Sequence, residues 1–228
     1  MSTASADTAT RLSAEGLAAC IDASCATPAA TRDEVAGFLK SLVGWDWAAV
    51  MVEPAYVAFA RPILTEMGQH LVTVLSYPLG AYTTETKLIQ AEQALEEGAD
   101  ELDVAMDLSA FRSGDLRRVV DDLKAVRRLA GDDHLVKTIY FSAVLSDVEA
   151  LRAAELSREA GITFLKTNPG YGNVTTPHHI QVIKERFGAE MKVMASGGVR
   201  THADAVAMLE AGADRIATSS PLVVLGVA

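Results

Sequence analysis

Three ionisable residues stand inside short apolar runs that otherwise have the composition of buried strands. Lys166 closes the run in FLKTNPG, Asp103 interrupts ELDVAM, and Lys137 interrupts LVKTIYF. A charge in such a run is costly unless it is paired or functional. A solvated lysine or a structural Asp–Lys pair is one interpretation. The other is that burial and a second cation lower the pKa of one lysine, whose neutral amine then attacks a carbonyl and forms a Schiff base.

Two further segments are typical of anion-binding turns. ASGGVR places Gly197 and Gly198 after one apolar run, and ATSS places Ser219 and Ser220 after the next. Backbone N–H groups and the N-terminus of a short helix can hold a phosphate at such turns. Glycine pairs alone are weak evidence, because they also occur in ordinary tight turns. Their position after the last two apolar runs is what favours the phosphate interpretation.

The elements that must position these residues recur as a unit. A helical pattern that ends in Gly and is followed by a short β-like run occurs four times, at 42–52, 96–106, 159–167 and 210–218. Glycine after a helix is typical of a left-handed cap, and the apolar runs are too short for helices. Further strands are expected at 71–77, 135–141, 191–196 and around 19–23.

Helix starts fall between these strands. Thr31-x-x-Glu34 and Ser146-x-x-Glu149 are capping boxes, and Thr176-Pro177 places proline in a first helical turn. Eight mostly apolar strands, each followed by a helix, predict one (β/α)₈ TIM barrel over residues 1–228, with residues 1–10 as a disordered tail. A doubly wound open sheet is the alternative.

A barrel gathers its chemistry at the C-terminal ends of its strands. Strands four, five and six would be adjacent, which would place Asp103, Lys137 and Lys166 along one arc of the interior.

Composition and charge exclude several function classes. The chain has 228 residues, a formal net charge of −10 and no block of Lys or Arg, so nucleic acid and anionic membranes lack an electrostatic attraction. No run approaches the roughly 20 apolar residues of a membrane helix, and the first ten residues lack the pattern of a signal peptide. We therefore expect a cytoplasmic protein. Cys20, Cys25 and the five histidines lack metal-ligand spacing, so no metal site is expected.

Several motifs together resemble the deoxyribose-phosphate aldolases. KTNPG, ASGGVR, GADRIATSS, YPLGAYTTE and EGADELDV match that family in order over most of the chain. The resemblance implies a class I aldolase on a (β/α)₈ barrel, which joins acetaldehyde to glyceraldehyde 3-phosphate reversibly without a metal or cofactor. It makes Lys166 the Schiff-base lysine, Asp103 a proton-relay carboxylate and Lys137 a neighbouring active-site lysine. The phosphate would be held by Gly170, Gly197, Gly198, Ser219 and Ser220.

The reaction centre departs from the family pattern. Met194 stands where the family has a second essential lysine, Glu53-Pro54 where it has Asn-Pro, and Phe141 where it has a glutamate. K-T-S-T-G has become Lys166-Thr167-Asn168-Pro169-Gly170, and I-D-H-T has become Ile21-Asp22-Ala23-Ser24. We expect Lys137 to supply the missing cation, so that the amine of Lys166 remains nucleophilic.

Three functions remain open on this basis. The first is a Schiff-base lyase that makes or breaks a carbon–carbon bond in a phosphorylated sugar or aldehyde. The second is another lysine-imine reaction, an isomerisation or condensation, with the phosphate site retained. The third is a non-catalytic binder of a phosphorylated metabolite. A homodimer is compatible with the sequence, which leaves the donor, the acceptor and the direction of reaction undefined.

Overall fold

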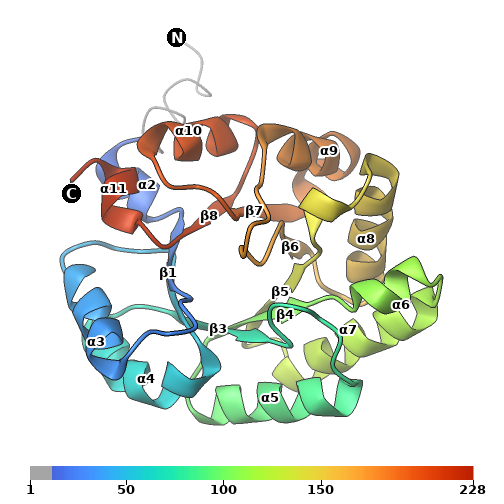
Figure 1. Ribbon diagram of the computed structural model, residues 1–228, viewed down its shortest axis with the longest axis horizontal. Helices are drawn as coiled ribbons and strands as arrows, with labels where there is room; N and C mark the ends of the chain where they lie inside the picture. Colours follow the sequence, from blue (N-terminus) through green and yellow to red (C-terminus); the bar gives the residue numbers. More distant parts are fainter. Residues whose placement is uncertain (1–11, 228) are drawn as a thin grey trace.

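A closed barrel of parallel strands forms the centre of the molecule (Figure 1). The computed structural model describes residues 12–227, and the tail expected at residues 1–10 lies outside them. Consecutive strands are neighbours, and the last strand pairs with the first, Ile21 lying opposite Ile216. The TIM-barrel prediction is confirmed, and the open-sheet alternative is wrong. The strands are β1 (Ile21–Cys25), β2 (Ala49–Val52), β3 (Leu71–Leu75), β4 (Glu101–Ala105), β5 (Leu135–Ile139), β6 (Phe164–Lys166), β7 (Lys192–Ser196) and β8 (Arg215–Thr218).

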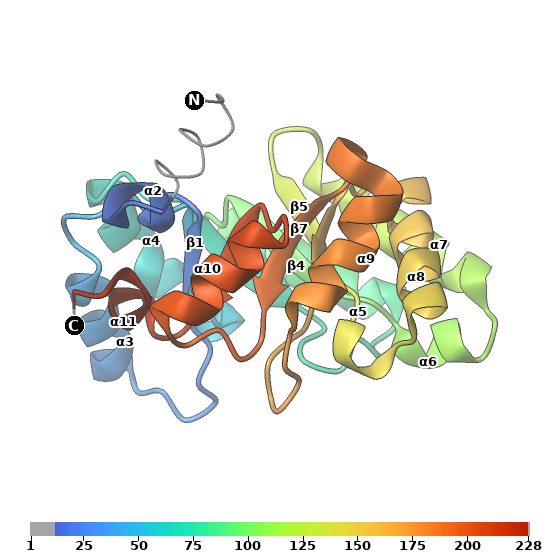
Figure 2. The ribbon, with the colours of Figure 1, turned by 90° about the horizontal axis from the view of Figure 1, so that it is seen from above.

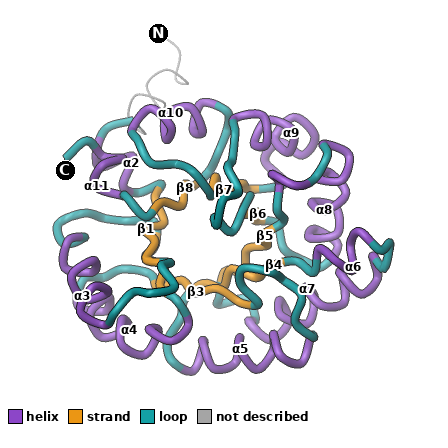
Figure 3. The backbone as a smooth tube through the Cα atoms, in the orientation of Figure 1, coloured by secondary structure: helices purple, strands orange, loops and turns teal. Residues whose placement is uncertain are grey.

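Helices surround the barrel as an outer ring (Figure 3). Among the described residues the α-helices are α2 (Ala14–Ala18), α3 (Arg32–Ser41), α4 (Val57–Glu66), α5 (Thr84–Glu96), α6 (Leu108–Arg112), α7 (Leu116–Ala130), α8 (Asp147–Glu159), α9 (Pro177–Phe187), α10 (His202–Glu210) and α11 (Pro221–Leu225). Short 3₁₀ turns are η1 (Pro54–Tyr56), η2 (Ser142–Val144) and η3 (Gly188–Glu190).

The expected helix boundaries are confirmed. The backbone N–H of Thr31 donates to Glu34 Oε2 at 2.7 Å, and the N–H of Ser146 donates to Glu149 Oε2 at 2.8 Å, which closes both capping boxes. Helix α9 begins at Pro177, as the Thr-Pro pair predicts. These caps satisfy N–H groups that would otherwise lack a partner at the helix start.

Side chains along each strand point alternately into the barrel and outward toward the helices. On β2, Val50 and Val52 belong to the core between strands and helices, whereas Ala49 and Met51 pack inside the barrel with residues of β3. The same alternation turns Asp103, Lys137 and Lys166 toward the barrel interior, where they are 0%, 0% and 2% exposed.

Loops after β1, β3 and β6 extend from one end of the barrel (Figure 2). This is the end at which the strands finish, so the residues that follow the strands gather there.

Candidate active site

A buried carboxylate joins the two lysines that the sequence singled out. Lys166 Nζ donates to Asp103 Oδ2 at 2.7 Å, and Lys137 Nζ donates to Asp103 Oδ1 at 2.9 Å. Neighbouring strands produce this arrangement, because Asp103 on β4 is the register partner of Lys137 on β5, and β5 pairs with β6. The structure thus brings together all three of the predicted catalytic residues.

The buried cluster is larger than the sequence suggested. Lys137 Nζ also lies 2.5 Å from Glu101 Oε2 and 3.4 Å from Asp22 Oδ2. Arg215, at the start of β8, bridges the same two carboxylates, at 2.9 Å from Glu101 Oε2 and 3.2 Å from Asp22 Oδ1. In the described residues of this cluster, three carboxylates therefore face three cations, and burying so many charges together depends on that balance.

The two aspartates of the cluster have pKa values shifted in opposite directions. Burial raises the pKa of Asp22 above its usual value, and the attraction of Lys137 and Arg215 does not offset it. Burial also acts on Asp103, but the ammonium groups of Lys137 and Lys166 outweigh it and hold the pKa of Asp103 below its usual value. The surrounding carboxylates, Asp103 first, overcome the burial of Lys137 and raise its pKa. Asp103 is thus an ionised acceptor and Lys137 a lasting cation.

Met194 lies beside Lys166 on the neighbouring strand. It is the register partner of Lys166 on β7, is fully buried, and packs with Phe164 and Ala217 inside the barrel. Phe164 lies under the charged cluster, with Lys137 Nζ 5.9 Å from its ring centre and the Arg215 guanidinium 5.6 Å away. The face of Lys166 toward β7 is therefore apolar.

A cavity of about 270 Å³ opens above Lys166 at the C-terminal ends of the strands. Ser24, Met51 and Tyr77 line it on the side of β1 to β3. Pockets for drug-sized ligands run from about 300 Å³ upward, so this one suits a small metabolite. Asp103 and Lys137 lie beneath its floor and, among the described residues, do not line it.

The predicted phosphate residues converge on the opposite side of the same cavity. Gly170, Gly197, Gly198 and Ser219 line it, together with Arg200. Ser220 does not line it, and its backbone N–H already donates to Thr218 Oγ1 at 3.1 Å. Ser219 is therefore the serine of this pair whose atoms reach the cavity.

Tight packing explains the glycines after β7. A Cβ atom on Gly197 would lie 2.3 Å from the carbonyl oxygen of Asn173, and one on Gly198 would lie 2.9 Å from Val174 Cγ1. Their φ angles of 97° and 85° are in the left-handed region that favours glycine. Both residues thus allow the loop after β6 to lie directly against the loop after β7.

Buried hydrogen bonds fix the segment that follows Lys166. Asn168 donates from Nδ2 to Ser142 Oγ and to Thr175 Oγ1, both at 2.9 Å, and accepts from the N–H of Ala143 at 3.1 Å. Thr167 Oγ1 donates to the carbonyl of Ser196 at 3.0 Å. The side chains of Thr167 and Asn168 therefore tie the KTNPG segment to β7 and to the turns after β5 and β6.

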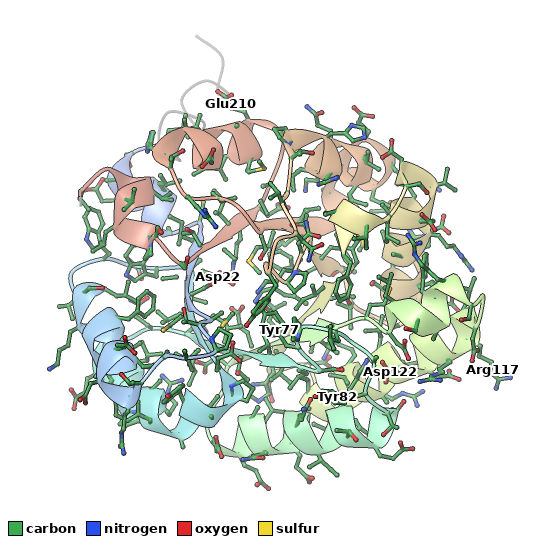
Figure 4. All side chains as sticks on the ribbon, viewed as in Figure 1. Asp22, Tyr77, Tyr82, Arg117, Asp122 and Glu210 are labelled. Carbon is green, nitrogen blue, oxygen red and sulfur yellow. The ribbon has the colours of Figure 1, made fainter. Side chains whose placement is uncertain are left out.

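Sequence reasoning missed several residues around the cavity mouth. Tyr77 donates its hydroxyl to the carbonyl of Pro169, and its ring lies 5.6 Å from that of Tyr171 in an edge-to-face pair. Figure 4 shows Tyr77 over the barrel interior and Asp22 on β1 at the barrel wall. Burial raises the pKa of Tyr77, with Tyr171 and Glu53 adding to the shift. The two tyrosines thus join the loops after β3 and β6 across the opening.

No described residues form a group of three or more His, Cys, Asp or Glu side chains arranged to hold a metal ion. Within residues 12–227, none of the helices is both long and apolar enough to span a membrane.

Comparison with known proteins decides the family. The model of the DeoC/LacD family aldolases matches residues 26–228. The chain belongs to the DeoC/LacD aldolase family. Membership in it makes the chain an aldolase, a lyase that acts on carbon–carbon bonds.

Several members of this family are similar along nearly their whole length. A deoxyribose-phosphate aldolase of Streptococcus suis is 36% identical over 206 residues, which cover 90% of this chain and 93% of the relative. One of Thermococcus gammatolerans is 37% identical, with 88% and 91% covered. The solved structure described as the unique tetrameric structure of deoxyribose phosphate aldolase from Aeropyrum pernix has a TM-score of 0.90 and 31% identity, with 97% and 94% covered. The DeoC/LacD match covers β2 to β8 and the loops that follow them, and it begins just after β1, whose Ser24 also lines the cavity.

Proposed function

We propose that this DeoC/LacD aldolase cleaves and forms a carbon–carbon bond in a phosphorylated sugar of the deoxyribose 5-phosphate type, through an imine at Lys166. One observation carries the proposal. A lysine held by a buried carboxylate at 2.7 Å stands at the floor of the same cavity whose far side consists of glycine and serine turns. The relatives named deoxyribose-phosphate aldolase support the choice of substrate.

The reaction begins when the neutral amine of Lys166 adds to the substrate carbonyl. The carbinolamine loses water and becomes a protonated imine, which draws electrons from the adjacent carbon–carbon bond. As this bond breaks, the hydroxyl on the departing carbon loses its proton to water and becomes the aldehyde of glyceraldehyde 3-phosphate, and an enamine remains on Lys166. The enamine takes up a proton at carbon and is hydrolysed to acetaldehyde and the free amine. Asp103 accepts the hydrogen bond of the reacting nitrogen and is kept ionised by Lys137. Lys137 is thereby a positioning residue beneath the cavity.

The phosphate of the substrate would lie against the turns after β6, β7 and β8. Gly170, Gly197, Gly198 and Ser219 line the cavity there and would bind the phosphate through backbone N–H groups, and Arg200 adds a cation to the lining. Ser220 stands at the N-cap position of the short helix α11 without a side-chain capping bond, and its backbone N–H donates to Thr218. The separation of an apolar, imine-forming side from a phosphate-binding side orients the sugar along the cavity.

Trapping the imine tests the proposal directly. Incubation with acetaldehyde and borohydride should add one ethyl group to Lys166, which peptide mass spectrometry locates. Lys166→Met should abolish the modification, whereas Lys192→Met, at the exposed start of β7, should retain it. Release of acetaldehyde from deoxyribose 5-phosphate, measured with a coupled dehydrogenase, tests the substrate separately. If the ethyl group were found on Lys137, Lys137 and not Lys166 would be the nucleophile. If the imine were trapped but deoxyribose 5-phosphate were not cleaved, the proposed substrate would be wrong and the imine chemistry would stand.

The homodimer and the cytoplasmic location remain predictions. The prediction that Lys137 favours the neutral form of the Lys166 amine also remains one. The isomerase and binding-protein alternatives predict no acetaldehyde release, so the same two measurements decide among the three functions.

A further inference from the structure

Glu53 is turned toward the barrel mouth by the alternation of β2. Ala49 and Met51 face the barrel interior, and Val50 and Val52 face the helices. Glu53 follows Val52 directly and continues the inward series, two residues beyond Met51, which lines the cavity. The family pattern that the sequence resembles has asparagine at this point, so the carboxylate is a particular feature of this chain.

The carboxylate of Glu53 has no structural task. The residue stands at the N-cap of η1, but its side chain makes no capping hydrogen bond there, unlike Thr31, Ser146 and Thr201 at their helices. Its Oε1 atom is buried and has no hydrogen-bond partner among the described residues. A buried polar atom without a partner costs free energy, and this one belongs to a residue that does not itself line the cavity but follows, two positions on, Met51, which does.

The charged and titratable groups around Glu53 come from three sides of the cavity. Lys166 on β6 attracts its charge, while Cys25 on β1, Tyr77 after β3 and Tyr171 after β6 each feel the charge of Glu53. Burial raises the pKa of Glu53, although Lys166 acts in the opposite direction. In contrast, Asp22, Glu101 and Asp103 are all engaged in ion pairs below the floor. Asp22 also has an oxygen without a hydrogen-bond partner, but it is ion-paired with Lys137 and Arg215. Among the described carboxylates of the site, Glu53 is thus the one outside the ion-pair cluster.

The proposed imine chemistry needs such a group, because Met194 cannot transfer a proton. We propose that Glu53 is a catalytic residue that transfers protons to and from the substrate at Lys166. This rests on the proposed function. In the direction of synthesis, the carboxylic acid of Glu53 gives its proton to the carbinolamine hydroxyl, which leaves as water and yields the protonated imine. The resulting carboxylate then removes one proton from the adjacent methyl carbon, the electron pair forms the enamine double bond, and Glu53 is again protonated.

Proton exchange measures this step without any acceptor. In D₂O the methyl protons of acetaldehyde should exchange in the presence of the protein, followed by NMR. Glu53→Gln, which keeps the shape but cannot transfer a proton, should slow exchange by on the order of 10²-fold. Glu66→Gln, on the exposed face of the following helix α4, is the matched control and should leave the rate unchanged.

The pH profile separates proton transfer from a structural effect. In the proposed cycle Glu53 starts as the carboxylic acid, so wild-type exchange should fall as pH rises through a pKa that lies above the usual glutamate value. This pH dependence of the exchange rate should disappear in Glu53→Gln. It should remain in Glu53→Asp, with a lower exchange rate. Thermal unfolding of each variant controls for folding.

The outcomes distinguish the two proposals. If Glu53→Gln exchanges protons as fast as wild type while Lys166→Met does not exchange them, the assignment of Glu53 is wrong and the imine at Lys166 stands. If Glu53→Asp behaves like Glu53→Gln, a carboxylate at this position is not the reacting group. If the wild type neither exchanges protons nor is trapped by borohydride, both proposals fail.

Discussion

At the scale of single residues, Asp103 determines how the two lysines behave. Its two oxygens each accept from one ammonium group, Oδ1 from Lys137 and Oδ2 from Lys166. In the proposed mechanism, Lys137 stays bound on one side, so that Asp103 would keep its position and charge when Lys166 becomes an imine. In this proposal Asp103 holds the amine of Lys137 as a cation and leaves the amine of Lys166 to react.

Lys137 should be more important for stability than any other lysine of the barrel. Lys137→Met would remove the cation shared by Asp22, Glu101 and Asp103. Breaking a buried ion pair from one side costs about 3–5 kcal/mol, so urea unfolding should show a loss of that size. Lys192→Met, at an exposed position, should change the free energy of unfolding by less than about 0.5 kcal/mol. A similar small loss for both variants would contradict the role given to Lys137.

At the scale of elements, the loops after β6 and β7 form one packed unit. Thr175 donates its backbone N–H to the carbonyl of Gly197 at 2.9 Å, and Gly197 approaches the carbonyl of Asn173 too closely for a side chain. The anion side of the cavity therefore depends on the contact between these loops as much as on either loop alone.

Gly197→Ala should disturb this unit and weaken binding of inorganic phosphate by about tenfold or more, a loss of about 1.4 kcal/mol of binding free energy. The new Cβ would meet a backbone carbonyl at 2.3 Å, which can be relieved only by moving the loop after β6. Gly114→Ala is the matched control, since Gly114 also has a positive φ, of 78°, but has open space and lies after α6. Calorimetric titration with phosphate measures both. If Gly197→Ala and Gly114→Ala bound phosphate with equal affinity, the assignment of the anion site to these turns would be wrong.

At the scale of the whole molecule, the barrel interior is an ionic core within an apolar shell. The outward-facing halves of the strands pack on the helices, whereas the inward-facing halves carry Asp22, Glu101, Asp103, Lys137, Lys166 and Arg215. Contacts between β1, β4, β5, β6 and β8 therefore depend on charge, and the stability of the barrel should depend on pH.

Asp103 sets the direction of this dependence. Its pKa in the folded protein lies below the usual value, so its contribution to stability is present above about 3.9, the value in an unfolded chain, and is lost as pH falls through the lower folded value. Asp103→Asn should be less stable than wild type at neutral pH, and the difference should shrink in acid. Urea midpoints across this range measure it, and a constant difference at every pH would show that Asp103 does not supply the effect.

The fold could be predicted because each strand and each turn carried its own local pattern. Short apolar runs after glycine-capped helices marked the strands, and capping boxes marked helix starts such as those at Thr31 and Ser146. Closure into a barrel followed from the number of units, since eight parallel strands with intervening helices have few other arrangements.

The candidate site could be predicted only where a charge interrupted an apolar run. Asp103, Lys137 and Lys166 did so, whereas Glu101 and Arg215 open their strands and look like ordinary flanking charges. Arg215 and Asp22 are 193 residues apart in sequence, and only barrel closure brings them to 3.2 Å. Strand parity would have found Glu101, which is two residues before Asp103, and Glu53, which is two residues after Met51. The tyrosine pair depends on loop conformations for which the sequence carries no periodic pattern.

Met194 and Phe141 have a consequence for how this chain can be changed by mutation. Both are buried and face the barrel. The resemblance to the deoxyribose-phosphate aldolases implies a lysine and a glutamate at these two positions. Exchanging a base and an acid for two apolar residues preserves the neutrality of the ionic core. Restoring the lysine alone would add a positive charge beside Lys166, and restoring the glutamate alone would add a negative one beside Tyr77. We therefore expect the two positions to be coupled, so that the double replacement is better tolerated than either single one.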